Sequence, residues 1–133
     1  MNNGDRYEGE WKNDKYEGKG FYYYNKDNEY NRKKYEGNFK SDKFEGKGIM
    51  YWNHGDRYEG DFKNDKREGK GIYYFNNGDI YEGEWKNDKF EGKGIYYFNS
   101  GKREMGNYLQ GNPIGKHVTL KANGDVKTKI YNN

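Results

Sequence analysis

The chain has 133 residues and balances 25 basic against 22 acidic side chains, which argues against a nucleic-acid-binding protein with a strongly basic face. It has no cysteine, which excludes disulfides and thiolate metal sites. Only 30% of the residues are apolar and 35% are charged, as in disordered chains, but 20% are aromatic, so we expect a folded protein whose Tyr, Phe and Trp side chains pack against glycine.

Along the chain, the tripeptide Tyr-Glu-Gly recurs at Tyr7, Tyr35, Tyr58 and Tyr81, with spacings of 28, 23 and 23 residues. The first spacing is longer because five extra residues precede Tyr35. We predict a single repeat domain, 1–133, with copies at 7–34, 35–57, 58–80 and 81–103, a degenerate copy at 104–126 and a terminal strand or cap at 127–133.

Each copy is predicted to form a β-hairpin. In the fourth copy, Tyr81, Gly83 and Trp85 alternate with glutamates and so share one face of a strand. In its second segment, Gly94 and Tyr96 also share a face, which lets aromatic rings lie over glycines across the hairpin. The glycines expected to have this structural role are Gly9, Gly18, Gly20, Gly37, Gly46, Gly48, Gly60, Gly69, Gly71, Gly83, Gly92 and Gly94.

The links between copies contain dipeptides such as Asn77-Gly78, which accept positive φ and favour a tight hairpin. Tight turns at both kinds of junction allow only antiparallel neighbours. The predicted fold class is therefore all-β: an elongated, single-layer antiparallel β-meander of repeated hairpins, forming an open twisted ribbon.

The fourth copy reads Tyr81-Glu-Gly-Glu-Trp85, followed by Gly92-Lys-Gly94-Ile-Tyr96, and the same landmarks return in fixed register in the earlier copies. This unit resembles the MORN repeat (membrane occupation and recognition nexus). The resemblance implies scaffolding at cell cortices, cytoskeletal structures, ciliary axonemes or membrane junctions, or an accessory role beside an enzyme.

A ladder of aromatic side chains and one methionine is expected on the glycine-bearing face. One interpretation is that these side chains pack against one another; the other is that they form a groove for a partner's peptide or helix, because a single-layer sheet cannot bury both faces. The predicted protein-binding face comprises Tyr7, Trp11, Tyr22, Tyr24, Tyr35, Phe39, Met50, Trp52, Tyr58, Phe62, Tyr73, Phe75, Tyr81, Trp85, Tyr96 and Phe98.

A series of lysines flanks the short loops inside the hairpins and would align along one edge of the ribbon. These lysines could contact anionic phospholipid headgroups. The alternative is a solvated edge that resists aggregation. The members of the possible lipid-binding edge are Lys12, Lys15, Lys40, Lys43, Lys63, Lys66, Lys86 and Lys89.

Catalytic patterns are weak. His54 and His117 fall at non-equivalent repeat positions and are interpreted as solvated side chains, and no nucleophile is placed beside a base by a known motif. The repeated Gly-Lys-Gly lacks the rest of a phosphate-binding loop. The recurring glutamates, such as Glu82, are expected to pair with lysines on the adjoining strand. We therefore expect no enzyme activity, no cofactor and no metal.

The leading hypothesis is a cytoplasmic, non-enzymatic protein-interaction scaffold, associated with cytoskeleton, cilium or membrane; the alternative is a phospholipid-binding module. The degenerate copy places Met105, Val118 and Leu120 opposite the aromatic face, where the tail or a second chain could cover them. The tail could instead run as one more strand, whose exposed edge would allow a homodimer through the C-terminal repeat.

Overall fold

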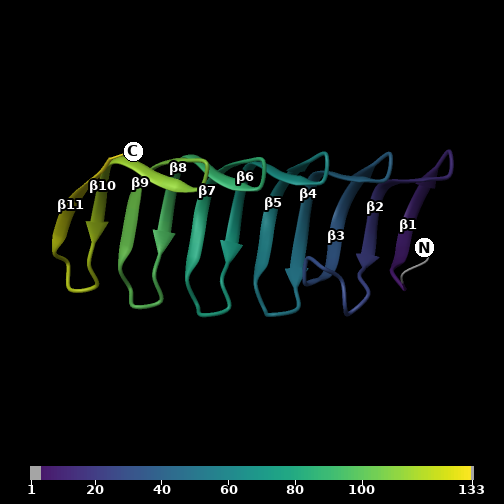
Figure 1. Cartoon of the computed structure of the whole chain (residues 1–133), viewed down its shortest axis with the longest axis horizontal. Coiled ribbons are helices and arrows are strands. Elements are labelled where there is room, and N and C mark those ends of the chain that lie inside the picture. Colours follow the sequence, from purple (N-terminus) through teal and green to yellow (C-terminus); the bar gives the residue numbers. More distant parts are fainter. Residues whose placement is uncertain (1–3, 133) are drawn as a thin grey trace.

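The computed structural model describes residues 4–132, and these form an 11-stranded antiparallel sheet whose spatial order follows the chain from β1 to β11. Figure 1 shows the strands side by side along the long axis, with the two chain ends at opposite ends of the ribbon. The strands are β1 (Arg6–Lys12), β2 (Lys15–Tyr23), β3 (Arg32–Lys40), β4 (Lys43–Trp52), β5 (Arg57–Lys63), β6 (Lys66–Tyr74), β7 (Ile80–Lys86), β8 (Lys89–Tyr97), β9 (Arg103–Leu109), β10 (Asn112–Leu120) and β11 (Val126–Tyr131).

The predicted all-β open meander is confirmed. The tail forms one further strand, β11, which pairs with β10 and does not lie across the sheet. The degenerate copy therefore does not end the sheet. Residues 1–3 and 133, which the predicted domain included, lie outside the described residues.

Two kinds of turn line the two long edges of the ribbon, at the top and bottom of Figure 1. Inside each hairpin the turn has two residues with positive φ, as at Asn87 (49°) and Asp88 (69°), which suits the right-handed twist of the strands. The Asn77-Gly78 link is a hairpin turn, as predicted, with a longer loop in which Gly78 alone has positive φ. Gly78 N–H donates to Phe75 O at 3.0 Å, and Phe75 N–H donates to Asp79 O at 2.9 Å across the loop.

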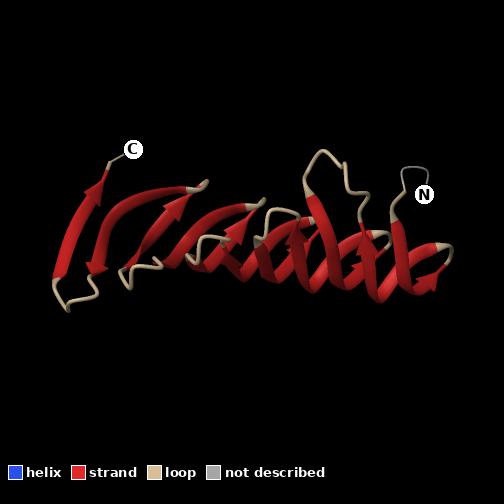
Figure 2. Ribbon diagram, turned by 90° about the horizontal axis from the view of Figure 1, so that it is seen from below, coloured by secondary structure: helices blue, strands red, loops and turns tan. Residues whose placement is uncertain are grey.

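A stripe of glycines crosses the strands at one level. Each stripe glycine is paired with the next across the ladder, and in each hairpin the register shifts just after the glycine of the first strand, as between Gly83 and Trp85. Such a bulge bends a strand, and Figure 2 shows the bent strands from below. The stripe consists of Gly9, Gly20, Gly37, Gly48, Gly60, Gly71, Gly83, Gly94 and Gly106.

One face of the stripe is covered by tyrosine rings. A Cβ atom built on Gly83 would lie 2.6 Å from the Tyr81 hydroxyl, which donates to the Glu84 carbonyl. The Tyr81 ring stacks on Phe90 with centroids 3.7 Å apart and meets Trp85 and Tyr108 edge-on. Since the same arrangement recurs around Tyr7 and Tyr35, a layer of rings over glycines replaces an aliphatic core.

The other glycines of the predicted set have a different role. Gly18, Gly46, Gly69 and Gly92 lie outside the stripe, and their φ values of 71°, 79°, 93° and 69° are in the left-handed region. They lie on the second strand of each hairpin beside the bulge, where the backbone must turn in a way that side chains with a Cβ disfavour.

Neighbouring copies are joined at the turn edge by an aspartate. Asp88 N–H donates to Arg67 O at 3.1 Å, and Arg67 N–H donates back to Asp88 Oδ1 at 2.8 Å. Beside them, Asn87 N–H donates to Glu68 Oε1 at 3.2 Å. Asp42, Asp65 and Asp88 thus each connect their hairpin to the hairpin before it.

The degenerate copy keeps the ring over the glycine by exchanging two residues. Glu104 replaces the tyrosine, and the ring of His117, which replaces a glycine, lies over Gly106. His117 is therefore fully buried, and the prediction that it is a solvated side chain is wrong. Its Nε2 takes the place of the tyrosine hydroxyl of the other copies and lies 2.9 Å from Asn107 O. Its Nδ1 lies 2.8 Å from Glu104 Oε2.

Candidate interaction surfaces

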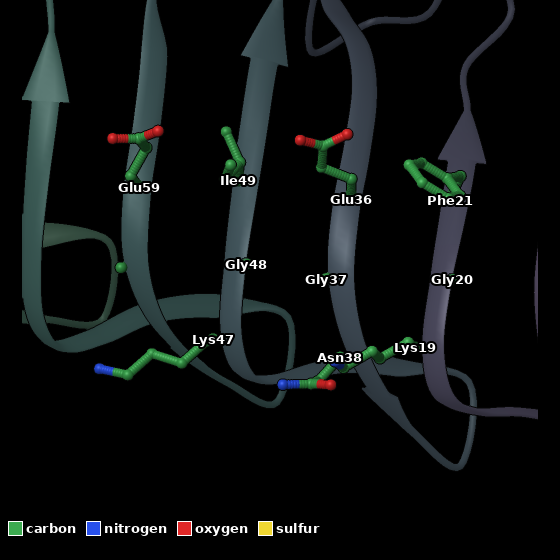
Figure 3. Close-up of a pocket in the computed structure, with 11 residues that line it drawn as sticks. Lys19, Gly20, Phe21, Glu36, Gly37, Asn38, Lys47, Gly48, Ile49 and Glu59 are labelled. Carbon is green, nitrogen blue, oxygen red and sulfur yellow. The ribbon is translucent and has the colours of Figure 1, made fainter.

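A trough runs across the strands on the side of the glycine stripe that faces away from the tyrosine rings. Figure 3 shows its first part, a depression of about 600 Å³ with glycines as its floor. Because glycine has no side chain, the floor is backbone and the side chains on either side rise as walls. This part is lined by Lys19, Gly20, Phe21, Glu36, Gly37, Asn38, Lys47, Gly48, Ile49, Glu59 and Gly60.

The trough continues toward the C-terminal end. A depression of about 540 Å³ lies over Gly71 and Gly83 and shares Glu59 and Lys47 with the first. A third, of about 460 Å³, lies over Gly94 and Gly106. The trough thus extends from β2 to β9 along the length of the ribbon, at right angles to the strands.

One wall alternates apolar and acidic side chains. Isoleucines from second strands, such as Ile49 and Ile72, stand between glutamates from first strands, such as Glu36 and Glu59. The predicted pairing of these glutamates with lysines on the adjoining strand is wrong. Glu36 lies 3.9 Å from Lys34 on its own strand, and Glu59 similarly lies 3.7 Å from Arg57.

Tyrosine hydroxyls also support this wall. Tyr51 donates to Glu36 Oε1 at 3.2 Å, and Tyr97 donates to Glu82 Oε1 at 3.3 Å. Burial, followed by the nearby Glu36 carboxylate, raises the pKa of Tyr51. The glutamates are therefore held in place while one side of each carboxylate faces the trough.

The opposite wall carries lysines at every second strand. The backbone N–H groups of Lys19 and Lys93 donate to the carboxylates of Glu10 and Glu84 at 2.7 and 2.9 Å. The side chain of Lys47 forms an ion pair with Asp61. Backbone donors therefore engage Glu10 and Glu84, while Asp61 is paired with the Lys47 ammonium group. The lysines along this wall are Lys19, Lys47, Lys70 and Lys93.

The aromatic side chains predicted as a binding face lie on the other side of the sheet, and half of them are buried. Tyr7, Tyr35, Phe39, Met50, Tyr58, Phe62, Tyr81 and Trp85 form the core, as the self-packing interpretation expected. Tyr22, Tyr24, Trp52, Tyr73, Phe75, Tyr96 and Phe98 are half-buried. Trp11 is 57% exposed because no described copy precedes it to cover the ring.

The half-buried rings form a row near the longer loops. The centroids of Tyr73 and Phe75 lie 4.6 Å apart, and those of Phe75 and Tyr96 lie 5.7 Å apart. Loop aspartates hold the hydroxyls: Tyr73 donates to Asp56 at 2.7 Å, and Tyr96 donates to Asp79 at 2.8 Å. These rings are therefore packed against one another and remain only partly accessible to solvent.

The lysines of the predicted lipid-binding edge all lie at the tight turns, and all are exposed. They form cross-strand pairs at the turn ends: Lys12 with Lys15, Lys40 with Lys43, Lys63 with Lys66 and Lys86 with Lys89. In most of these turns the intervening aspartate is occupied by the preceding copy. The edge therefore projects more positive than negative charge.

Sequence reasoning missed the trough, although the signal was present. In each Gly-Lys-Gly-Ile segment, such as 92–95, the lysine and the isoleucine point away from the rings on either side of the second glycine. The alternation of side chains on the face opposite the rings, compared across successive strands, predicts both walls.

Other chemistry is sparse in residues 4–132. No cluster of His, Asp and Glu in this part of the chain could hold a metal ion. His54 Nε2 lies 3.0 Å from Asp56, and its Nδ1 lies 2.8 Å from Asn31 Nδ2, which places it in the loop framework. No described segment is a helix long and apolar enough to span a bilayer.

No curated protein matches the chain significantly. The family model for the MORN repeat matches residues 7–29, 35–57, 58–80 and 81–103, most of the chain and all of the regular copies. With the hairpin geometry described above, this match shows that the chain belongs to the MORN repeat family.

Proposed function

We propose that the chain is a non-enzymatic protein-interaction scaffold that holds an extended segment of a partner protein in the trough. MORN repeats are known as interaction or membrane-binding modules, which supports a binding role. The observation that carries the proposal is the continuity of the trough from β2 to β9, with a backbone floor throughout and the same two walls in the central copies.

The spacing of the walls favours an extended partner. Neighbouring strands lie about 4.8 Å apart, so equivalent wall residues recur about every 9.6 Å. A polyproline II segment advances about 9.3 Å in three residues, so every third side chain would meet the same environment. An α-helix rises about 5.4 Å per turn, and no whole number of turns equals the spacing of about 9.6 Å between equivalent wall residues.

The charges define what such a segment would carry. Glutamates on one wall favour Lys or Arg side chains, while the lysines opposite favour Asp or Glu. The isoleucines between the glutamates, such as Ile72, offer apolar contact. A partner with mixed charge and a period of three residues would satisfy both walls at once.

The sequence had suggested the aromatic face as the binding surface. The burial of Tyr35, Tyr58 and Tyr81 favours the trough instead, because these rings already support the fold and cannot also contact a partner. A cytoplasmic location at cytoskeletal, ciliary or cortical structures is part of the proposal and rests on the family alone.

A displayed library of random peptides tests the proposal. Peptides selected on the intact chain should lose about tenfold or more of their affinity for an Ile49→Glu, Ile72→Glu double variant, since each ~1.4 kcal/mol is a factor of ten. The matched control is Ile130→Glu in β11, where the side chain is 61% exposed and lies beyond the trough. Peptides that bind all three chains equally would contradict the proposal.

The lysine edge supports a second candidate function, binding of anionic lipid surfaces. Each lysine near such a surface contributes about 1 kcal/mol, and the effect is screened by salt. The chain should co-sediment with phosphatidylserine vesicles at low salt, and Lys63→Glu, Lys66→Glu should weaken this binding. If the chain fails to bind at any salt concentration, the lipid function is excluded and the trough proposal is unaffected.

A further inference from the structure

The turns of the second, third and fourth hairpins each place a carboxylate on the hairpin before them, and this contact recurs with little variation. In each case the oxygen accepts from the backbone N–H of the second residue of the return strand. The bonds are Tyr16 to Asp42 at 2.8 Å, Phe44 to Asp65 at 2.9 Å and Arg67 to Asp88 at 2.8 Å.

At the junction between the fourth and fifth copies the carboxylate is missing. Gly111 stands where the earlier turns have aspartate, yet its N–H still donates to Phe90 O at 2.9 Å, so the backbone arrangement is unchanged. The Phe90 N–H is left without an acceptor among residues 4–132. A Cβ atom built on Gly111 would meet only Lys89 Cβ, at 3.9 Å, so the space of the missing side chain is open.

This space opens into a depression of about 260 Å³ on the aromatic side of the sheet, away from the trough. Arg67 and Lys89 supply positive charge there, and Asp88 is the acidic residue of its lining. Asp88 is already engaged, because Arg67 Nε lies 3.1 Å from its Oδ1. The remaining lining is Tyr73, Phe75, Trp85, Phe90 and Gly111.

Arg67 is itself unusual, since it takes the place of the ring that stacks on the tyrosine in other copies. Its guanidinium carbon lies 4.8 Å from the Trp85 ring centre and 5.6 Å from that of Tyr73. The rings and the Asp88 contacts fix the guanidinium in position, so its charge is held at the depression without a further loss of side-chain freedom.

We infer that this depression is a binding site for a carboxylate group of a partner polypeptide. The carboxylate takes the place of the side chain that Gly111 lacks, accepts a hydrogen bond from Phe90 N–H and faces the cations of Lys89 and Arg67. The aromatic lining receives an apolar group next to the carboxylate. A carboxylate is the ligand indicated because the protein places that same group at the three equivalent junctions.

This inference does not rest on the proposed use of the trough, because the two sites lie on opposite faces. The test is an NMR titration of the ¹⁵N-labelled full chain, read at the Phe90 amide. The probes are N-acetyl-aspartate N′-methylamide for a side-chain carboxylate and N-acetyl-phenylalanine for a chain-terminal one. The neutral asparagine analogue and inorganic phosphate are the comparison probes.

One or both carboxylate probes should shift the Phe90 amide saturably, with a dissociation constant on the order of millimolar for so small a ligand. The asparagine analogue should not shift it. No saturable shift with either carboxylate, or an equal shift with the asparagine analogue, overturns the inference. A shift with phosphate and neither carboxylate also overturns it.

Gly111→Asp sharpens the test because it supplies the carboxylate from within. The φ of Gly111 is 89°, near the 69° of Asp88, so aspartate suits this backbone. The variant should fold, melt at a higher temperature and no longer respond to the probes at Phe90. Gly124→Asp adds the same charge at a φ of 95° with no atom near its Cβ, and should keep the response. If Gly111→Asp folds and responds like the parent chain, the inference is wrong.

Discussion

The regular copies and the degenerate fifth copy build the same structure from different residues. In the fourth copy the ring of Tyr81, on β7, lies over Gly94 on β8. In the fifth copy the ring of His117, on β10, lies over Gly106 on β9. Tyr81 meets Trp85 and Tyr108 edge-on, and His117 meets Tyr108 and Tyr131 in the same way. The repeat therefore requires a planar ring over glycine with a hydrogen bond to the carbonyl beyond it, and either residue can supply this.

The two regions differ in how they are joined to the next hairpin. Pro113 stands where Phe44 and Arg67 offer an N–H to the following turn, and proline has no N–H. Ile114 replaces the glutamate that accepts from the same turn in the other copies, such as Glu68. The fifth copy receives contacts from the fourth but lacks the groups that would bind another turn.

Alkaline pH should unfold the regular copies, because it ionises their buried tyrosine rings. Burial raises the pKa of Tyr35, Tyr58 and Tyr81 well above 10, and raises that of Tyr24 to about 12. Because the folded pKa values are raised, this stability is fully present below pH 10 and is lost as the pH rises through the folded values. Tyrosinate absorbance and circular dichroism should change together above about pH 11. Complete tyrosine titration near pH 10 with the fold intact would contradict the ring arrangement.

A side chain at a stripe glycine should be the most damaging single substitution. In Gly83→Val the new Cβ would lie 2.6 Å from Lys93 O and 2.7 Å from Gly94 Cα, so backbone must move. We expect a loss of about 3 kcal/mol or more. Glu82→Val, on the face away from the rings, should cost less than about 1 kcal/mol. Urea denaturation measures both, and equal midpoints would show that the faces are reversed.

Reverting the exchange in the fifth copy should have an intermediate effect. His117→Gly removes the ring and leaves a cavity over Gly106, at a cost of about 2–4 kcal/mol. Adding Glu104→Tyr to the same chain should recover most of that loss, because it restores the residues of a regular copy. Failure of the double variant to regain stability would contradict the equivalence of the two rings.

Removing a turn carboxylate should have the smallest effect and should depend on position. Asp88→Ala leaves Arg67 N–H without its acceptor and should cost about 1–2 kcal/mol. Asp14→Ala removes the same residue from a turn with similar φ for which no described copy precedes, and should cost at least about 0.5 kcal/mol less than Asp88→Ala. Thermal melts of the two variants make the comparison, and an equal loss would mean that the contact between copies contributes nothing.

The repeat itself could be predicted because spacing, alternation and glycine placement agree. Tyr81, Gly83 and Trp85 share a face in the sequence pattern and in the sheet, and rings lie over glycines as expected. The burial of His117 could not be predicted from its own copy. His117 is buried because Glu104, thirteen positions earlier, stands where the other copies have the tyrosine ring. Such an exchange between two strands can be recognised only when the strand register is known.

The trough could be predicted only in part for a related reason. Each wall is made of residues from successive strands, such as Glu36, Ile49 and Glu59, that are far apart in the chain. Their alternation was visible, but the bend at the glycines that turns a flat face into a trough follows from the bulges. No residue pattern that we recognised signalled those bulges.

The most direct test of the interaction scaffold is photo-crosslinking from the trough in cells that make the chain. A benzoylphenylalanine at position 49 or 72, in the intact chain, should capture one and the same partner polypeptide from both positions. The same probe at position 130, in β11 beyond the trough, serves as the comparison. The account predicts a common adduct at the two trough positions and a weaker or different one at position 130. Equal capture of that partner from position 130, or no common adduct from positions 49 and 72, would contradict the claim that the trough is the binding surface.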